Sequence, residues 1–141
     1  MDIPWVAAFV AGAIAQAVKL LLGVSRLRSY GWRALWSLPG MPSTWAARCG
    51  ALCTIILRRE GWASPLVAAA VAYSCLVLYD DLRLRRSAGR QARLLNAIAR
   101  DLELKERGAA ARHLRELVGE TPAQVLAGVA LGVAIGLPWP R

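Results

Sequence analysis

Histidine is nearly absent from this sequence: among 141 residues there is one, His113, and there are only three cysteines. No Ser-His-Asp arrangement and no glycine-rich nucleotide loop is visible. We interpret His113, which lies in a basic stretch, as a solvated surface residue. The cysteines at positions 49, 53 and 75 lie in apolar segments, which indicates small packing residues and not a disulfide framework or a zinc site. No metal ion or cofactor is therefore predicted.

Acidic residues are also scarce. The sequence has nine Asp and Glu residues and 18 Lys and Arg residues, so the net charge is +9. Even so, 57% of the residues are hydrophobic. The charged residues gather between long apolar stretches, whereas a soluble domain of this length would intersperse them more evenly. This pattern predicts a single domain (1–141) with an all-α fold, an integral membrane helical bundle with basic loops. No secretory signal pattern is present, so the first segment is expected to be a permanent anchor.

Four apolar segments are predicted, at about 4–24, 43–57, 62–79 and 122–137. The first is long enough to cross a bilayer, which takes about 20 residues. The second is short and contains Arg48; it is tilted, re-entrant, or extended by the arginines at 58 and 59. Ser64-Pro65 and Thr121-Pro122 mark helix starts, and Gln124 completes a capping box with Thr121.

The arginines are distributed unevenly over the loops. Three lie between the first two segments, and a much larger number lie between the last two. With four spans these regions share one side of the membrane. The positive-inside rule places that side in the cytoplasm and both termini outside. The expected location is the plasma (inner) membrane.

The region 83–118 contains a basic amphipathic helix. Its mostly apolar face has spacings of three and four residues. The members of this face are Leu84, Ala88, Gln91, Leu95, Ile98 and Leu102. One interpretation is a helix on the cytoplasmic membrane surface, held by acyl chains and anionic head groups. The other is that its first turn supplies arginines to a phosphate site. Nucleic-acid binding is disfavoured, because this basic surface lacks aromatic residues.

Five motifs resemble the divergent branch of the phosphatidic-acid-phosphatase type 2 family, which is related to acid phosphatases and vanadium haloperoxidases. They run from Gln16-Ala17-Val18-Lys19 to Glu120-Thr121-Pro122-Ala123-Gln124-Val125-Leu126-Ala127-Gly128. The three between them are Gly40-Met41-Pro42-Ser43-Thr44-Trp45-Ala46, Gly61-Trp62-Ala63-Ser64-Pro65, and Tyr79-Asp80 followed by Arg85-Arg86-Ser87-Ala88-Gly89-Arg90-Gln91-Ala92 and Leu95-Asn96.

The resemblance implies a phosphatase site in which one histidine attacks phosphorus and a second protonates the leaving oxygen. Here Glu120 and Trp45 stand at the two histidine positions, and Gln124 stands at an acidic one. A tryptophan cannot transfer a proton at neutral pH, and a glutamate repels an incoming phosphate. Because Trp45, Glu120 and Gln124 lack the chemistry of the residues they replace, no catalytic residue is assigned.

The phosphate-binding side of the motif is better preserved. The positions that the resemblance implies are Lys19, Ser43, Thr44, Arg85, Arg86 and Arg90. A lysine in an apolar helix is functional or paired, or it snorkels to the interface. The resemblance brings Glu120 close to Arg85 or Arg86, which predicts an ion pair in the place of the phosphate. From local chemistry alone, the Glu120 segment is simply the capped start of a helix.

The expected function is that of a catalytically degenerate, phosphatase-like membrane protein. It would bind a phosphorylated lipid head group or act as a partner subunit at the cytoplasmic face. The alternatives are an active lipid or prenyl phosphate phosphatase and a structural adaptor that binds anionic lipid. The expected partners are anionic or phosphorylated membrane lipids, with a homo-oligomer or a membrane partner protein, and no nucleic acid.

Overall fold

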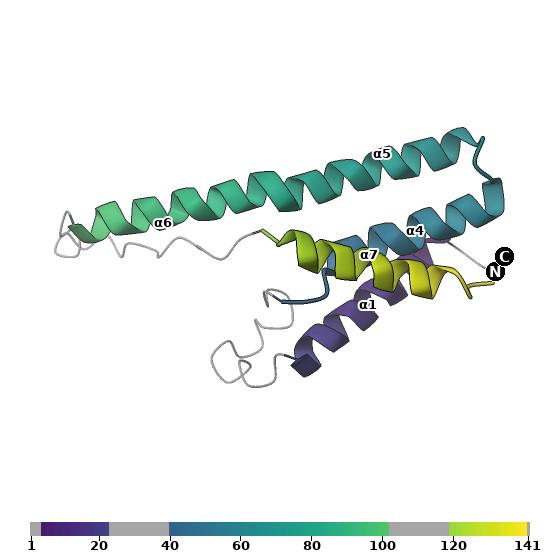
Figure 1. The fold of residues 1–141 in the computed structure, drawn as a ribbon, viewed down its shortest axis with the longest axis horizontal. Coiled ribbons are helices and arrows are strands. Elements are labelled where there is room, and N and C mark those ends of the chain that lie inside the picture. The colour runs from purple at the N-terminus through teal and green to yellow at the C-terminus, as the bar shows by residue number, and fades with distance from the viewer. Residues whose placement is uncertain (1–3, 23–39, 102–118, 141) are drawn as a thin grey trace.

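The computed structural model describes residues 4–22, 40–101 and 119–140; at 99–101 it describes the backbone only. Over these ranges the protein is all-α, as the sequence predicts, and no strand occurs in them. The elements are α1 (Pro4–Leu22), α4 (Thr44–Glu60), α5 (Pro65–Tyr79), a π-helical turn η2 (Asp80–Leu84), α6 (Arg85–Asp101) and α7 (Pro122–Gly136). The ribbon shows α1, α4 and α7 packed together, with α5 and α6 forming a separate long rod (Figure 1).

Each of the four predicted apolar segments corresponds to one of the helices α1, α4, α5 and α7, although α4 extends to Glu60, beyond the predicted end at 57. Two helical stretches are long and apolar enough to cross a membrane, Pro4–Leu22 and Pro65–Ile98, and α7 is a shorter apolar helix. The predicted helix in the region 83–118 is present as α6, while its remainder at 102–118 lies outside the described residues. The four-span topology and the single-domain boundary stay predictions.

Helix α4 is the centre of the bundle, because α1, α5 and α7 all pack against it. The closest approach is between α4 and α7, where one face of α7 carries Gly128, Gly132 and Gly136, all buried. A Cβ atom on Gly132 would lie 2.8 Å from the backbone nitrogen of Ala51, and closer still to the carbonyl oxygen of Ala47. Small residues let membrane helices approach backbone to backbone, so these glycines set the distance between α4 and α7.

The core between α1 and α4 is also made of small side chains. Ala11 and Ala15 of α1 and Ala47 and Ala51 of α4 are fully buried and form one apolar cluster. Alanine costs little entropy in a helix and permits close packing. The larger apolar side chains of α1, such as Phe9 and Leu21, are exposed instead, as expected for a surface that faces lipid.

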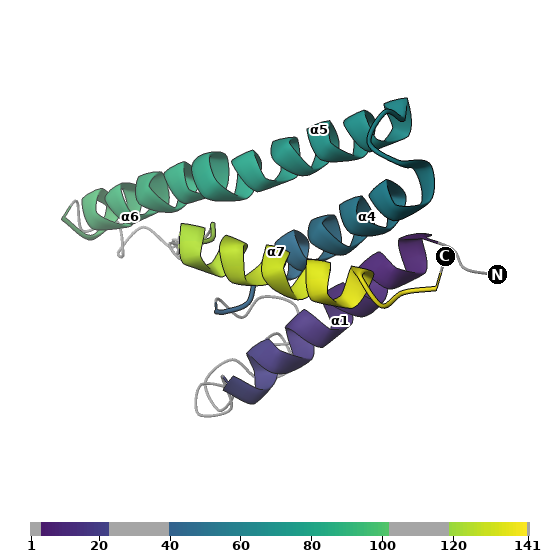
Figure 2. The same ribbon diagram turned by 45° about the vertical axis from the view of Figure 1, so that its right-hand side comes forward.

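Helix α5 continues into α6 without a break. Ser64 caps its start and Pro65 occupies the first turn, as the sequence predicts. At its other end, the backbone N–H of Asp80 donates to the carbonyls of Leu76 and Val77, and η2 carries the helix on into α6. The sequence predicts the apolar segment at 62–79 and the basic helix that begins at about 83 as two elements, but in the structure they form one continuous helix. Both ribbon views show one nearly straight rod (Figures 1 and 2).

Four helix ends meet at one end of the bundle. The starts of α4 and α7 and the turn η2 that follows α5 are joined there by backbone hydrogen bonds, and Lys19 in the last turn of α1 contacts Glu120. The Ser43 backbone N–H donates to the Gln124 carbonyl at 3.0 Å, and the Glu120 N–H donates to the Asp81 carbonyl at 3.3 Å. These bonds join segments that are far apart in the sequence and bring side chains from several of the motifs together at this end.

Candidate functional site

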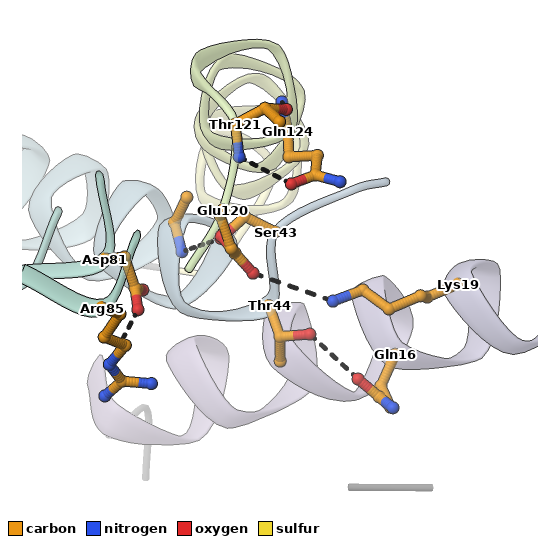
Figure 3. A network of polar contacts seen from close by, with 10 residues as sticks. Gln16, Lys19, Ser43, Thr44, Asp81, Arg85, Glu120, Thr121 and Gln124 are labelled. Carbon is orange, nitrogen blue, oxygen red and sulfur yellow. Dashed lines mark hydrogen bonds and ion pairs between the residues drawn. The ribbon is translucent and has the colours of Figure 1, made fainter. Parts of the chain in front are cut away.

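Lys19 and Glu120 form the centre of a polar cluster, which we define as Lys19, Ser43, Asp81, Arg85 and Glu120 (Figure 3). The Lys19 Nζ lies 3.9 Å from Glu120 Oε1, and the two side chains are 7% and 18% exposed. The sequence predicted an ion pair between Glu120 and Arg85 or Arg86, and this prediction was wrong in its partner. A lysine buried in an apolar helix needs a counter-charge, and here Glu120 supplies it.

Arg85 pairs with two carboxylates close to it in sequence. Its Nε lies 2.9 Å from Asp80 Oδ2 and 3.1 Å from Asp81 Oδ1. Asp80 and Asp81 precede Arg85 by about one helical turn, so the three side chains share one side of the helix. The two aspartates therefore hold Arg85 by local contacts, which explains why Glu120 pairs with Lys19 instead.

Ser43 is fully buried and caps α4. Its hydroxyl accepts a hydrogen bond from the Ala46 N–H at 3.0 Å, the usual role of an N-cap serine. A Cβ atom on Gly128 would lie 2.5 Å from the Ser43 carbonyl oxygen, so α7 closes directly over this cap. The sequence assigned Ser43 a phosphate-binding role but did not show that it is the N-cap of α4.

Thr44 and Trp45 follow Ser43 on the first turn of α4. The Thr44 hydroxyl donates to Gln16 Oε1 at 3.0 Å, one turn from Lys19 (Figure 3). Trp45 is 42% exposed, and its ring lies 4.9 Å from the guanidinium carbon of Arg48. The position of one family histidine is therefore occupied by an indole that makes a cation–π contact.

Burial raises the pKa of the Glu120 carboxyl above its ordinary value, while the neighbouring Ser43 hydroxyl and Lys19 lower it and Asp81 raises it. One oxygen, Oε2, is buried without a hydrogen-bond partner among the described residues. The cluster with Asp80 holds three carboxylates and two cations. With Glu120 ionised, these five charged side chains alone carry one more negative than positive charge, which opposes an incoming phosphate.

Gly119 allows the chain before Glu120 to lie directly against the backbone of Arg86. Its φ of 90° favours glycine, and an added Cβ would lie 2.5 Å from the Arg86 backbone nitrogen. After it, Thr121 caps α7, and the predicted capping box with Gln124 is confirmed. The local interpretation of this segment as a capped helix start is therefore also correct, because the same segment both starts α7 and delivers Glu120.

The structure brings Lys19, Ser43 and Arg85 into the cluster, with Thr44 beside it (Figure 3). The residues Arg86 and Arg90 are exposed and make no ion pair with any described residue. His113 and the arginines of the first loop lie outside the described residues. Across the described ranges no group of three or more His, Cys, Asp and Glu side chains could hold a metal ion.

A groove of about 390 Å³ opens next to the cluster, between the start of α4 and the α5–η2 rod. Most of its lining residues are apolar or aromatic, and the two charged ones, Asp80 and Arg85, lie toward the α6 end of the rod. The lining residues are Trp45, Tyr73, Leu76, Val77, Tyr79, Leu84, Asp80 and Arg85. A groove that is apolar along its length and charged at one end matches an amphiphile in shape and polarity.

Packed apolar helices that bring a lysine, a serine and an arginine together at one end define a helical membrane protein with a buried polar cluster. The chain belongs to the divergent PAP2 family, whose profile matches residues 2–135. It is also 29% identical over 146 residues to the uncharacterized membrane protein YuiD of Bacillus subtilis (strain 168), covering 96% of this chain and 92% of that protein. No solved structure matches. The family resemblance found in the sequence is confirmed.

Proposed function

We propose that this protein binds a phosphorylated lipid head group at the polar cluster without hydrolysing it. The observation that carries the proposal is the convergence of Lys19, Ser43 and Arg85 at a site where Trp45 and Glu120 replace both histidines. Cations and hydroxyls can bind a phosphate, but the described residues of this site include neither a histidine nucleophile nor a histidine acid. The lipid's acyl chain would lie in the adjacent groove beside Trp45 and Tyr73.

The site lies on the cytoplasmic side of the plasma (inner) membrane in this proposal. Arg83, Arg86, Arg90 and Arg93 follow the end of α5 that contacts the cluster, whereas Arg58 and Arg59 lie at the far end of α4. The positive-inside rule favours the arginine-rich side as cytoplasmic. The amphipathic α6 then begins at the site, where anionic lipid is most abundant.

Glu120 controls access to Lys19 in this proposal. A head group must take the place of the Glu120 carboxylate, since both are oxyanions that need the same ammonium group. Because burial raises the pKa of Glu120, its carboxylate is neutralised at a higher pH than an exposed glutamate. A fall in pH through the raised pKa of Glu120 therefore frees Lys19 and removes one of the repelling charges, so head-group binding strengthens as Glu120 is protonated.

No phosphate release is expected when the purified protein is incubated with phosphatidic acid in detergent, beyond the rate of a Lys19→Gln variant. General acid–base catalysis alone contributes about 10²–10⁴-fold, and Trp45 cannot supply it. The measurement is inorganic phosphate over time. Turnover well above the control that is lost in Glu120→Ala would instead establish an active lipid phosphatase.

The Glu120→Gln variant is expected to bind phosphatidic acid about tenfold more tightly than the wild type at pH 8, since removing one nearby charge is worth ~1–4 kcal/mol. The affinities should converge as the pH falls and Glu120 becomes neutral in the wild type. Binding can be measured by native mass spectrometry of the detergent-solubilised protein. Glu60→Gln is the matched control, because Glu60 is exposed at the other end of α4.

Comparing Glu120→Gln with the wild type at each pH removes the titration of the lipid phosphate itself, which also changes near neutral pH. Equal affinity of Glu120→Gln, Glu60→Gln and the wild type at pH 8 would contradict the competition between Glu120 and the head group. Undiminished binding by Lys19→Gln would show that the head group binds elsewhere.

A further inference from the structure

The rod formed by α5, η2 and α6 is longer than a membrane is thick. It runs from Pro65 to Asp101, which corresponds to about 55 Å at the rise of an α-helix, against ~30 Å for the hydrocarbon core. Both views show that α6 keeps the direction of α5 (Figures 1 and 2). If α5 crosses the bilayer, α6 therefore leaves the membrane and does not lie flat on its surface.

An apolar face on α6 is left uncovered. We call it the α6 stripe and define it by the described members of the amphipathic face: Leu84, Ala88, Gln91, Leu95 and Ile98. The three large aliphatic side chains Leu84, Leu95 and Ile98 are 58%, 54% and 53% exposed. Isolated exposed leucines are common, but the five members of the stripe recur on one face at alternating spacings of four and three. That is the seven-residue repeat of a two-stranded coiled coil.

The charges of α6 lie away from the stripe. Arg86 and Arg93 occupy the outermost position of the repeat, and Arg90 lies beside them. The positions that flank the stripe carry mostly uncharged side chains. They are Ser87, Ala92 and Leu94, with Arg85, which Asp80 and Asp81 already neutralise.

We propose that the α6 stripe pairs with the α6 stripe of a second copy of this chain, forming a short parallel coiled coil outside the membrane. The charge distribution selects this occupant. Two identical basic helices would normally repel each other, but here Arg86 and Arg93 occupy the outermost position of the repeat, and the residues of the stripe itself are apolar or neutral. The membrane holds both copies in the same orientation, which a parallel pair requires, and a two-fold axis places each stripe against itself. This interaction surface begins next to the groove, since Leu84 belongs to both, but Gln91, Leu95 and Ile98 lie beyond the groove lining and the polar cluster.

Gln91 is the one polar member of the α6 stripe, and it falls at a core position of the repeat. In a pair its amide would face the same amide of the second copy, and the two can hydrogen-bond to each other. A single polar core residue of this kind fixes the register and favours two strands, at some cost in stability. It also disfavours a continuous lipid-facing surface.

The proposal is tested by disulfide formation in native membranes. The three native cysteines are first replaced by alanine in the full chain. Leu95→Cys or Ile98→Cys is then introduced on the stripe, with Arg93→Cys on the exposed opposite face as the matched control. After mild oxidation, dimers are quantified on a non-reducing gel. Core positions of a parallel pair bring equivalent Cα atoms within disulfide range, so both stripe variants should yield at least about fivefold more dimer than Arg93→Cys.

A second measurement guards against random collision. In the cysteine-containing wild type, Leu95→Glu should shift the detergent-solubilised protein from dimer to monomer mass by light scattering, while Arg93→Glu should not. Equal disulfide yields at all three positions would overturn the proposal. So would stripe thiols that neither form disulfides nor react with a water-soluble maleimide, because the bilayer or another part of the chain would then cover the stripe.

Discussion

Gly132→Leu is expected to prevent α7 from packing against α4 and to abolish the folded bundle. The first side-chain carbon at this position would already overlap the backbone of Ala47 and Ala51, and a backbone cannot turn aside as a flexible side chain can. Extra methylenes in a packed core cost about 1–3 kcal/mol, and a whole leucine against two peptide groups exceeds that range. The detergent-solubilised variant should elute as aggregate in size-exclusion chromatography.

The matched control is Ala134→Leu, because Ala134 lies on the same helix but is exposed. This variant adds apolar volume on the lipid-facing side and should elute like the wild type. A soluble, monodisperse Gly132→Leu protein with unchanged thermal stability would show that α7 does not approach α4 as closely as the structure indicates.

Lys19→Met is expected to lower the free energy of unfolding by about 3 kcal/mol at pH 8, the low end of the cost of breaking a buried ion pair. The substitution leaves the Glu120 carboxylate buried beside Asp81 without its cation. The raised pKa of Glu120 gives the pH dependence its sign: as pH falls, the carboxyl takes up a proton and the cost of Lys19→Met shrinks. Equilibrium unfolding in mixed micelles of detergent and dodecyl sulfate measures it.

The double variant Lys19→Met/Glu120→Gln should recover most of this loss, because replacing both members of a buried pair by neutral groups is often close to neutral. Only a double-mutant cycle separates the pair from its surroundings. Strictly additive losses would mean that Lys19 and Glu120 do not interact, and the polar cluster would then lack its central contact.

The resemblance and the local helix signals predicted much of this structure. Ser64-Pro65 and Thr121-Pro122 begin α5 and α7 as expected, because caps are decided by neighbouring residues. The family motifs also indicated which distant residues meet, so Lys19, Ser43 and Glu120 were correctly placed in one region. Their role in binding phosphate stays a prediction.

Two features could not be predicted from the sequence, each for a physical reason. The pairing of Glu120 with Lys19 depends on Arg85 being occupied already by Asp80 and Asp81, which is a competition between contacts that only the folded arrangement settles. The continuity of α5 and α6 was hidden by two adjacent aspartates, which end the apolar segment without ending the helix. An apolar pattern shows where a helix passes from an apolar to a polar environment. It does not show where the helix ends.

The central position of α4 also has a consequence for synthesis. Helix α4 leaves the ribosome early, yet the surface that receives the α7 glycines stays vacant until the chain has been made past residue 136. During that interval Ser43, Ala47 and Ala51 face lipid or an insertion factor instead of their final neighbour. The assembly of α1, α4 and α7 must therefore follow the insertion of the last helix, so maturation of this protein is timed by its C-terminal segment.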